Sequence, residues 1–271
     1  YLADPWYLGC TVGRFANRLS AKRVRVGTNN FELIGHDGDK HCLHGGPEGF
    51  HRQAWQIATS TGRSELIYTH VDAHNTCGFP GRISAEITYR VAEPGQLIID
   101  YAARTDRPTV LSMTHHGYFN LHGNGKTVDG HILQIDADSY LPVDTEGIPI
   151  GDIADITGTT FDLRQPRLLT PEDRYDTCFV LNEGADALRT VASVHSPVSG
   201  ITMAVHTTQL CMQLYTSDML GEPFGPRRGL CLETQHYVDA PNQPAFPSAE
   251  LTADQVYRHR TVYSFVMDPR T

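Results

Sequence analysis

The stretch RISAEITYRVAEPGQLIIDYAARTD, residues 82–106, contains two candidate strands and the turn between them. Apolar and polar residues alternate through 82–93 and again through 96–106. A period of two indicates half-buried β-strands. Glu93-Pro94-Gly95 supplies turn chemistry between the two runs. The stretch therefore predicts two neighbouring strands joined by a short turn.

The same alternation recurs along most of the chain. It is found at 65–73, 131–144, 188–196, 200–208, 212–220 and 261–268, with turn residues at 144–147 and 197–200. Helical periodicity is scarce, but TPEDRY (170–175) predicts a short helix with Thr170 as N-cap and Pro171 at the first helical position. Many antiparallel strands linked by short turns predict an all-β fold, a large antiparallel β-sandwich.

Bulk composition is that of an ordinary globular protein. The 271 residues are 40% hydrophobic and 20% charged. No linker or internal repeat divides them, so we expect a single domain over 1–271. The formal net charge of −9 argues against a nucleic-acid partner. No apolar run approaches the ~20 residues of a membrane span, so we expect no membrane partner. The sequence does not indicate an oligomeric state.

The beginning of the chain and its cysteines bear on the compartment. The first residues lack the pattern of a signal peptide, and they also lack an initiator Met, so we expect the natural N-terminus to be missing. The six cysteines are scattered without a C-x-x-C pair, which favours reduced thiols over a disulfide scaffold. We therefore expect a cytoplasmic protein.

Polar residues gather at a few places rather than being spread evenly over strand faces. The candidates are Asn17, Arg18, His41, His44, His51, His115, His116, Asn120, Asp176, Gln213 and Glu233. Each alone has an ordinary structural explanation, such as a solvated arginine or a turn-capping aspartate. Glu233 is the exception, because it directly follows the apolar run Leu230-Cys231-Leu232. A carboxylate beside apolar residues is costly unless it is paired or used.

Two kinds of chemistry fit these residue types. A metal site could draw on His41, His44, His115, His116 and Glu233, but H-x-x-H on a glycine-rich loop matches neither a helical H-E-x-x-H motif nor a Cys/His knuckle. An acid–base pair of one Glu and one or two His is the alternative. The carboxylate would accept a proton, and a neighbouring His, favoured in its charged form, would donate one.

Five blocks together resemble the aldose 1-epimerase (galactose mutarotase) family. They are GRFANRL (13–19), LHGGPEGFHRQAW (43–55), THHGYFNL (114–121), YLPVDTEGIPIGDIADITGTTFDLR (140–164) and CLETQHYVDAPNQPAFPS (231–248). They occur in the family's order and extend over nearly the whole chain. The resemblance implies a β-supersandwich, the galactose mutarotase fold, that lacks the family's first few strands. It also implies interconversion of the α and β anomers of free aldoses such as galactose and glucose, without metal or cofactor.

The matching motifs imply a role for each site residue. Glu233 falls on the family's general base, His116 on its general acid, and His44 on a second donor beside the sugar ring oxygen. Arg18, Asp176 and Gln213 fall on residues that hydrogen-bond sugar hydroxyls, with Asn17 nearby. The small-molecule aldose is the one partner that this resemblance implies.

Four positions depart from the family pattern, and two alternative functions remain. His115 stands where Asn is usual and Gly117 where Ser is common, while Thr177-Cys178 replaces a frequent His-Asn pair. A hexose-phosphate mutarotase would need extra cations for the phosphate, for which Arg227 and Arg228 are the candidates. A sugar-binding module without catalysis is disfavoured, because both Glu233 and His116 are present.

Overall fold

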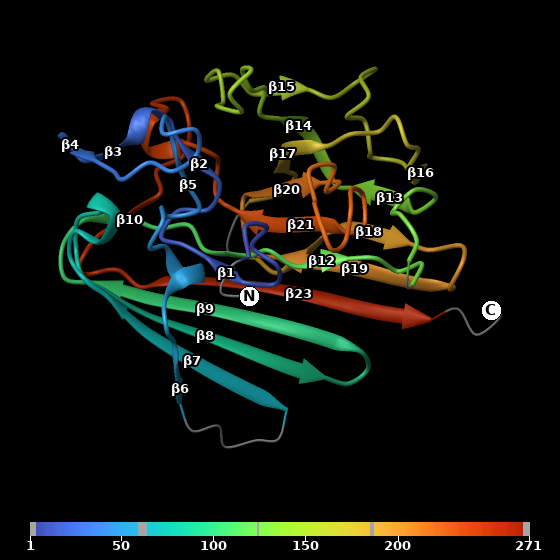
Figure 1. Ribbon diagram of the computed structural model, residues 1–271, viewed down its shortest axis with the longest axis horizontal. Helices are drawn as coiled ribbons and strands as arrows, with labels where there is room; N and C mark the ends of the chain where they lie inside the picture. The colour runs from blue at the N-terminus through green and yellow to red at the C-terminus, as the bar shows by residue number, and fades with distance from the viewer. Residues whose placement is uncertain (1–3, 59–63, 124, 185–186, 268–271) are drawn as a thin grey trace.

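Residues 4–58, 64–123, 125–184 and 187–267 are described in a computed structural model (Figure 1). Two large antiparallel sheets dominate it. One has the strand order β16 (Arg167–Leu168), β13 (Ile132–Ile135), β18 (Arg189–His195), β19 (Ile201–Thr207), β23 (Tyr257–Met267), β9 (Gln96–Thr105), β8 (Ile83–Ala92), β7 (Glu65–Asp72) and β6 (Gln56–Ala58). The other has the order β12 (Tyr118–Phe119), β21 (Leu230–Gln235), β20 (Cys211–Tyr215), β17 (Asp176–Leu181), β14 (Ala137–Tyr140) and β15 (Ala154–Asp155).

Short strand pairs and single turns of 3₁₀ helix complete the described part of the chain. The pairs are β1 (Thr11–Val12) with β11 (Thr114–His115), β2 (Arg18–Leu19) with β5 (Cys42–Leu43), β3 (Arg23–Val26) with β4 (Asn29–Glu32), and β10 (Thr109–Val110) with β22 (Glu250–Leu251). The 3₁₀ turns are η1 (Ser20–Lys22), η2 (Phe50–Arg52), η3 (Thr76–Gly78) and η4 (Ala240–Asn242). The all-β antiparallel architecture predicted from the sequence is confirmed.

The two large sheets share one hydrophobic core, and this core determines which side chains of β21 point inward. Leu230 and Leu232 of β21 are fully buried in a core that also contains Ile99 and Tyr263 of the nine-stranded sheet. The hydroxyl of Tyr263 donates to the carbonyl of Leu232 over 3.0 Å. Because side chains alternate along a strand, Glu233 points to the opposite face. The core contacts of β21 therefore direct Glu233 away from the nine-stranded sheet.

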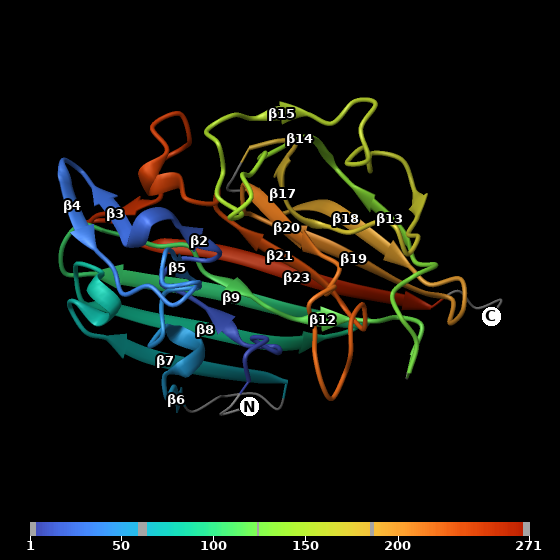
Figure 2. The same ribbon diagram turned by 45° about the horizontal axis from the view of Figure 1, so that its top comes forward.

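A second core joins the N-terminal segments to the loop after β21. Phe15 and Leu19 pack there with Val238 and Ala240, and both views show η4 beside β3 (Figures 1 and 2). Asp239 is fully buried, and its Oδ1 accepts from the backbone N–H of Ser20 over 2.9 Å. This packing brings the blocks around residues 17 and 44 to the face of the six-stranded sheet that points away from the nine-stranded sheet, which we call its free face.

Several elements differ from the sequence expectations. The helix expected at 170–175 is wrong: it is a turn, in which the N–H and hydroxyl of Thr170 both donate to Asp173 Oδ2 over 2.8 Å. The run at 131–144 splits into β13 and β14. The run at 212–220 ends at Tyr215, and Ser217 has a φ of 54° that a strand does not accommodate.

The last strand differs from the prediction, whereas the cysteines agree with it. β23 begins at Tyr257, four residues before the predicted start at 261, and residue 268 of that prediction lies outside the described residues. All six cysteines are unpaired, as predicted. None of the helical segments in the described ranges has the length and apolarity needed to cross a membrane.

Candidate active site

Glu233 lies in the middle of β21, and the strand register sets its neighbours. Its partner on β20 is Gln213, whose partner on β17 is Cys178. Asp176 lies two residues before Cys178 on the same side of β17. The side-chain amide of Gln213 donates to Asp176 Oδ1 over 2.6 Å. Three adjacent strands thus place Glu233, Gln213 and Asp176 in one row on the free face of the sheet.

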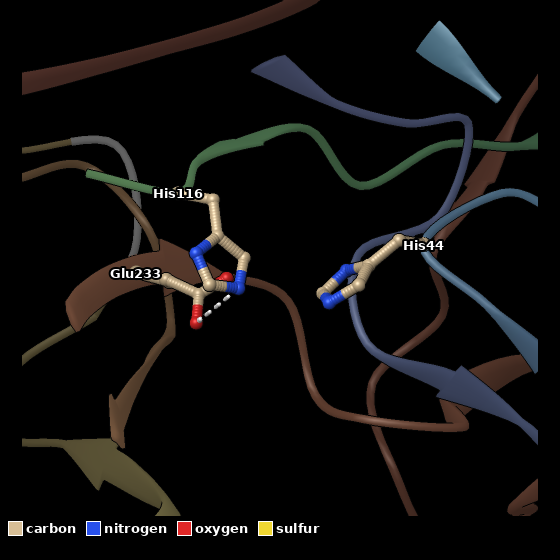
Figure 3. Close-up of side chains that lie close together, drawn as sticks. All are labelled: His44, His116 and Glu233. Carbon is tan, nitrogen blue, oxygen red and sulfur yellow. Dashed lines mark ion pairs between the residues drawn. The ribbon is translucent and has the colours of Figure 1, made fainter. Parts of the chain in front are cut away.

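His116 reaches the same face from the segment between β11 and β12. Its backbone N–H donates to the carbonyl of Cys10 over 2.9 Å, and its carbonyl accepts from the N–H of Gly9 over 2.9 Å. These bonds hold the ring so that its Nε2 lies 3.7 Å from Glu233 Oε1 (Figure 3). Its Nδ1 lies 3.6 Å from the sulfur of Cys231, two residues before Glu233. The two expected catalytic groups are therefore neighbours.

His44 is held by the segment that carries Asn17. The backbone N–H of His44 donates to the carbonyl of Asn17 over 3.0 Å, and the N–H of Asn17 donates to Nδ1 of His44 over 3.2 Å. Both residues have left-handed backbone, with φ of 52° and 64°. Gly45 follows, where a Cβ would lie 1.9 Å from the carbonyl oxygen of Gly13. The close approach of these backbones therefore requires glycine and fixes the His44 ring 5.3 Å from that of His116.

All seven residues expected at the site line one cavity of about 350 Å³: Asn17, Arg18, His44, His116, Asp176, Gln213 and Glu233. A second cavity of about 320 Å³ adjoins it and is lined in part by Cys178. Larger cavities lie elsewhere, but none of their linings includes Glu233 or His116. We therefore identify the cavity of about 350 Å³ as the candidate active site.

The sequence interpretation missed several lining residues, namely Pro5, Trp6, Tyr7, Asp37, Leu43, Tyr118, Tyr215 and Met219. Tyr118 belongs to the THHGYFNL block and could have been found there. Asp37 comes from an unmatched loop, and its Oδ2 accepts from Nε of Arg18 over 2.7 Å. Trp6 and Tyr7 precede the first block. No residue pattern indicates that these loop positions reach the cavity.

Burial governs the charge state of Glu233 and His116, the candidate catalytic pair. Burial, with a smaller contribution from the nearby Asp176 carboxylate, raises the pKa of Glu233 well above its ordinary value. Burial lowers the pKa of His116 to about 4 and that of His44 well below its ordinary value. The expectation that a His beside the carboxylate is favoured in its charged form is therefore wrong here, because desolvation outweighs the attraction. Burial thus disfavours the charged form of each group, and the two, as neighbours, titrate as a coupled pair.

The geometry also tests the metal alternative. His44, His116 and Glu233 do converge, with possible ligand atoms within 4.8 Å of one another. A metal-binding His normally donates its second ring N–H to an acceptor. In His44 that second nitrogen, Nδ1, instead accepts from the Asn17 N–H, so the proton is on Nε2. His44 is thus arranged as a hydrogen-bond donor, and its tautomer does not fit a metal ligand.

The remaining candidates have partners other than Glu233 and His116. Nε2 of His41 lies 3.2 Å from Glu146 Oε2, and Nδ1 of His115 lies 3.4 Å from the hydroxyl of Tyr89. The ring of His51 packs on that of Tyr7, 4.7 Å between centroids. The amide of Asn120 donates to backbone carbonyls at Lys126 and Arg228. These four polar residues therefore have structural partners of their own.

The chain is similar to proteins of known name over nearly its whole length. The family model for aldose 1-epimerase matches residues 1–264. The aldose 1-epimerase of Escherichia coli (strain K12) is 34% identical, over 99% of this chain and 82% of that protein. The galactose mutarotase of Homo sapiens is 33% identical, over 98% of this chain and 80% of that protein.

Solved structures agree with these matches. The GalM/aldose epimerase homologue from C. elegans has a TM-score of 0.91 at 29% identity, covering 98% of this chain and 85% of that one. The galactose 1-epimerase from Lactobacillus acidophilus NCFM has a TM-score of 0.84 at 25% identity, covering 98% and 82%. With a family model matched over residues 1–264 and relatives above 30% identity, the chain belongs to the aldose 1-epimerase family.

Proposed function

We propose that the protein is an aldose 1-epimerase, an isomerase that interconverts the α and β anomers of free aldoses such as galactose and glucose. The observation that carries this proposal is the buried pair of His116 and Glu233, 3.7 Å apart, in a cavity that also holds a row of sugar-compatible polar groups. A positioned acid and base in one cavity are what ring opening requires.

The chemistry needs one proton taken and one proton given. Glu233 accepts the proton of the anomeric hydroxyl as the C1–O5 bond breaks, and O1 becomes the oxygen of a carbonyl. The electron pair of the broken bond goes to O5, which receives a proton from His116. Rotation about C1–C2 turns the other face of the carbonyl towards O5, and the reverse transfers close the ring. The cycle starts from the form in which Glu233 is ionised and the pair's proton is on His116, and ring closure restores that form.

The other polar residues would hold the sugar during these transfers. The Nε2–H of His44 can donate to the ring oxygen, because Nδ1 is already occupied by the Asn17 N–H. Asp176, Gln213 and Arg18 can bond the sugar hydroxyls, with Asn17 shaping the same wall. Buried polar groups of this kind discriminate between sugars, since a missing hydroxyl leaves them unpaired.

A free aldose fits this cavity better than a sugar phosphate. Among the described lining residues, Arg18 is the only arginine or lysine, and it is paired with Asp37. Arg227 is bound to Asp129 and Asp218, and Arg228 donates to the carbonyl of Gly125. Neither of these arginines lines the cavity. A phosphate would therefore face carboxylates there with little compensation.

Polarimetry tests the proposed function. Freshly dissolved α-D-galactose, α-D-glucose and α-D-xylose should each approach equilibrium rotation faster with the protein than without it. Binding of the sugars without any acceleration would instead support a non-catalytic module. Acceleration confined to a hexose phosphate would favour the phosphate alternative. Exhaustive treatment with a chelator should leave the rate unchanged, because the His44 tautomer is set for donation.

The pH dependence of kcat/KM should be bell-shaped, with its acid limb near pH 4. Because burial lowers the pKa of His116 to about 4, the pair gains a second proton only below that pH and then lacks a base. Above the raised pKa of Glu233 the pair loses its only proton and lacks an acid. Initial rates, corrected for spontaneous mutarotation, measure the profile. An acid limb near pH 6.5, the ordinary value for His, would contradict this assignment.

A further inference from the structure

The lining of the active-site cavity contains two chemically different sets of residues. Asn17, Arg18, Asp37, Asp176 and Gln213 are polar or charged. Trp6, Tyr7, Tyr118, Tyr215 and Met219 contribute aromatic or apolar surface. A pyranose ring is divided in the same way, with hydroxyls around its rim and C–H groups on its faces. The aromatic groups therefore offer an apolar surface for which a sugar face is the matching partner.

Most of these rings are already engaged with protein. The Tyr7 ring packs on His44 at 4.6 Å between centroids and on His116 at 5.7 Å. The Tyr118 ring packs on His116 at 5.1 Å and on Tyr215 at 6.4 Å. Trp6 differs from them. Its half-buried indole makes no ring contact, and its ring N–H has no hydrogen-bond partner, among the residues that the structure describes.

The backbone around Trp6 is nevertheless fixed. The two carboxylate oxygens of Asp4 accept from the N–H of Trp6 over 2.8 Å and from that of Leu8 over 2.6 Å. The hydroxyl of Tyr118 donates to the carbonyl of Trp6 over 2.9 Å. Gly221 leaves room for the indole, since a Cβ there would lie 2.8 Å from Cζ2 of Trp6. These contacts therefore hold the indole ring at the cavity, while its ring N–H and part of its apolar surface remain available to a ligand.

We propose that Trp6 is a substrate-binding residue of this site, on which the C–H face of the aldose ring packs. In this arrangement the indole N–H would donate to a sugar hydroxyl. This inference rests on the proposed function, because it takes an aldose as the ligand. Trp6 precedes the five motif blocks and lies within the residues matched by the family model.

Fluorescence tests the contact without depending on turnover. The chain has two tryptophans, and Trp55 is bound elsewhere, its ring N–H donating to the carbonyl of Phe50 over 3.0 Å. In Trp55→Phe, the emission of Trp6 should change in a saturable way on titration with D-galactose. D-Glucitol, which has hydroxyls but no ring, controls for bulk solute effects. Unchanged Trp6 emission at galactose concentrations that saturate the rate would overturn the proposal.

Kinetics supply the second readout. Trp6→Ala should raise KM by about 5- to 20-fold with kcat within about 2-fold, because a packing surface binds ground state and transition state alike. Trp6→Phe should recover most of the loss, and Trp55→Phe should keep the wild-type KM. A wild-type KM in Trp6→Ala would refute the proposal. Sugar-dependent Trp6 emission without mutarotation in wild type would overturn the proposed function and leave this inference standing.

Discussion

The strand side and the loop side of the active site are built by different means. β17, β20 and β21 present Asp176, Gln213 and Glu233 through ladder register, so that each position is fixed by many backbone hydrogen bonds. Asn17 and His44 instead lie on loops with left-handed backbone, held by two hydrogen bonds to each other. In the proposed reaction, the ladder positions the base Glu233, while the loops position Asn17 and His44 around the sugar.

Removing the proton acceptor from the strand side should have the largest effect. Glu233→Gln keeps the shape of the side chain and takes away the base, which typically costs about 10²- to 10⁴-fold in rate. Sugar should still bind, as calorimetry can measure. The matched control is Glu172→Gln, an exposed position outside the cavity. A Glu233→Gln variant with wild-type rates would show that the base lies elsewhere.

Asp176 tests whether the strand side also selects the sugar. A hydrogen bond to a charged group contributes about 1.5–3 kcal/mol, so Asp176→Ala should lower kcat/KM by roughly 10- to 150-fold for sugars that carry the contacted hydroxyl. The matching deoxy sugar should lose much less. We would compare galactose, glucose, arabinose and 2-deoxyglucose. An equal loss on every sugar would mean that Asp176 acts only by holding Gln213.

The altered pair after Asp176 sharpens the same test. Because side chains alternate along β17, Cys178 shares the side of Asp176 and lines the adjoining cavity, whereas Thr177 faces the other way. Cys178→Asn should therefore change the ranking among the four sugars without affecting the catalytic pair. An unchanged ranking would show that position 178 does not contribute to specificity.

The loop side should give the smallest effect. Asp37 and Arg18 are partly exposed, at 30% and 22%, and such pairs contribute about 0–1 kcal/mol. Asp37→Asn should raise KM by about 2- to 5-fold, since Arg18 loses a positioning partner, and kcat should stay unchanged. Asp39→Asn is the control. Asp39 lies in the same turn as Asp37, pairs with Lys22 and is 88% exposed. A fall in kcat in Asp37→Asn would place this loop in the chemical step.

The same contrast explains what the sequence could predict. The period-two alternation identified the long strands, because strand geometry is regular. The resemblance of five blocks to a family identified seven residues, distant in sequence, that line one cavity. Trp6 and Asp37 could not be foreseen, since they reach the cavity through irregular chain paths. The charge state of His116 also escaped prediction, because it depends on burial, which the spacing of residues does not encode. The prediction of a helix at 170–175 failed because Asp173 accepts two hydrogen bonds from Thr170, which hold this segment in a turn.

The position of β21 has a consequence for how the enzyme loses activity. Every residue of this strand is buried, and β12 and β20 pair with it on either side. Amides in such a strand exchange with solvent only through the largest opening events, while edge strands such as β6 and β15 can fray separately. Glu233, the proposed base, therefore lies in a strand that we expect to open only with global unfolding. Heating should leave catalysis intact through local fraying and abolish it in one step with global unfolding.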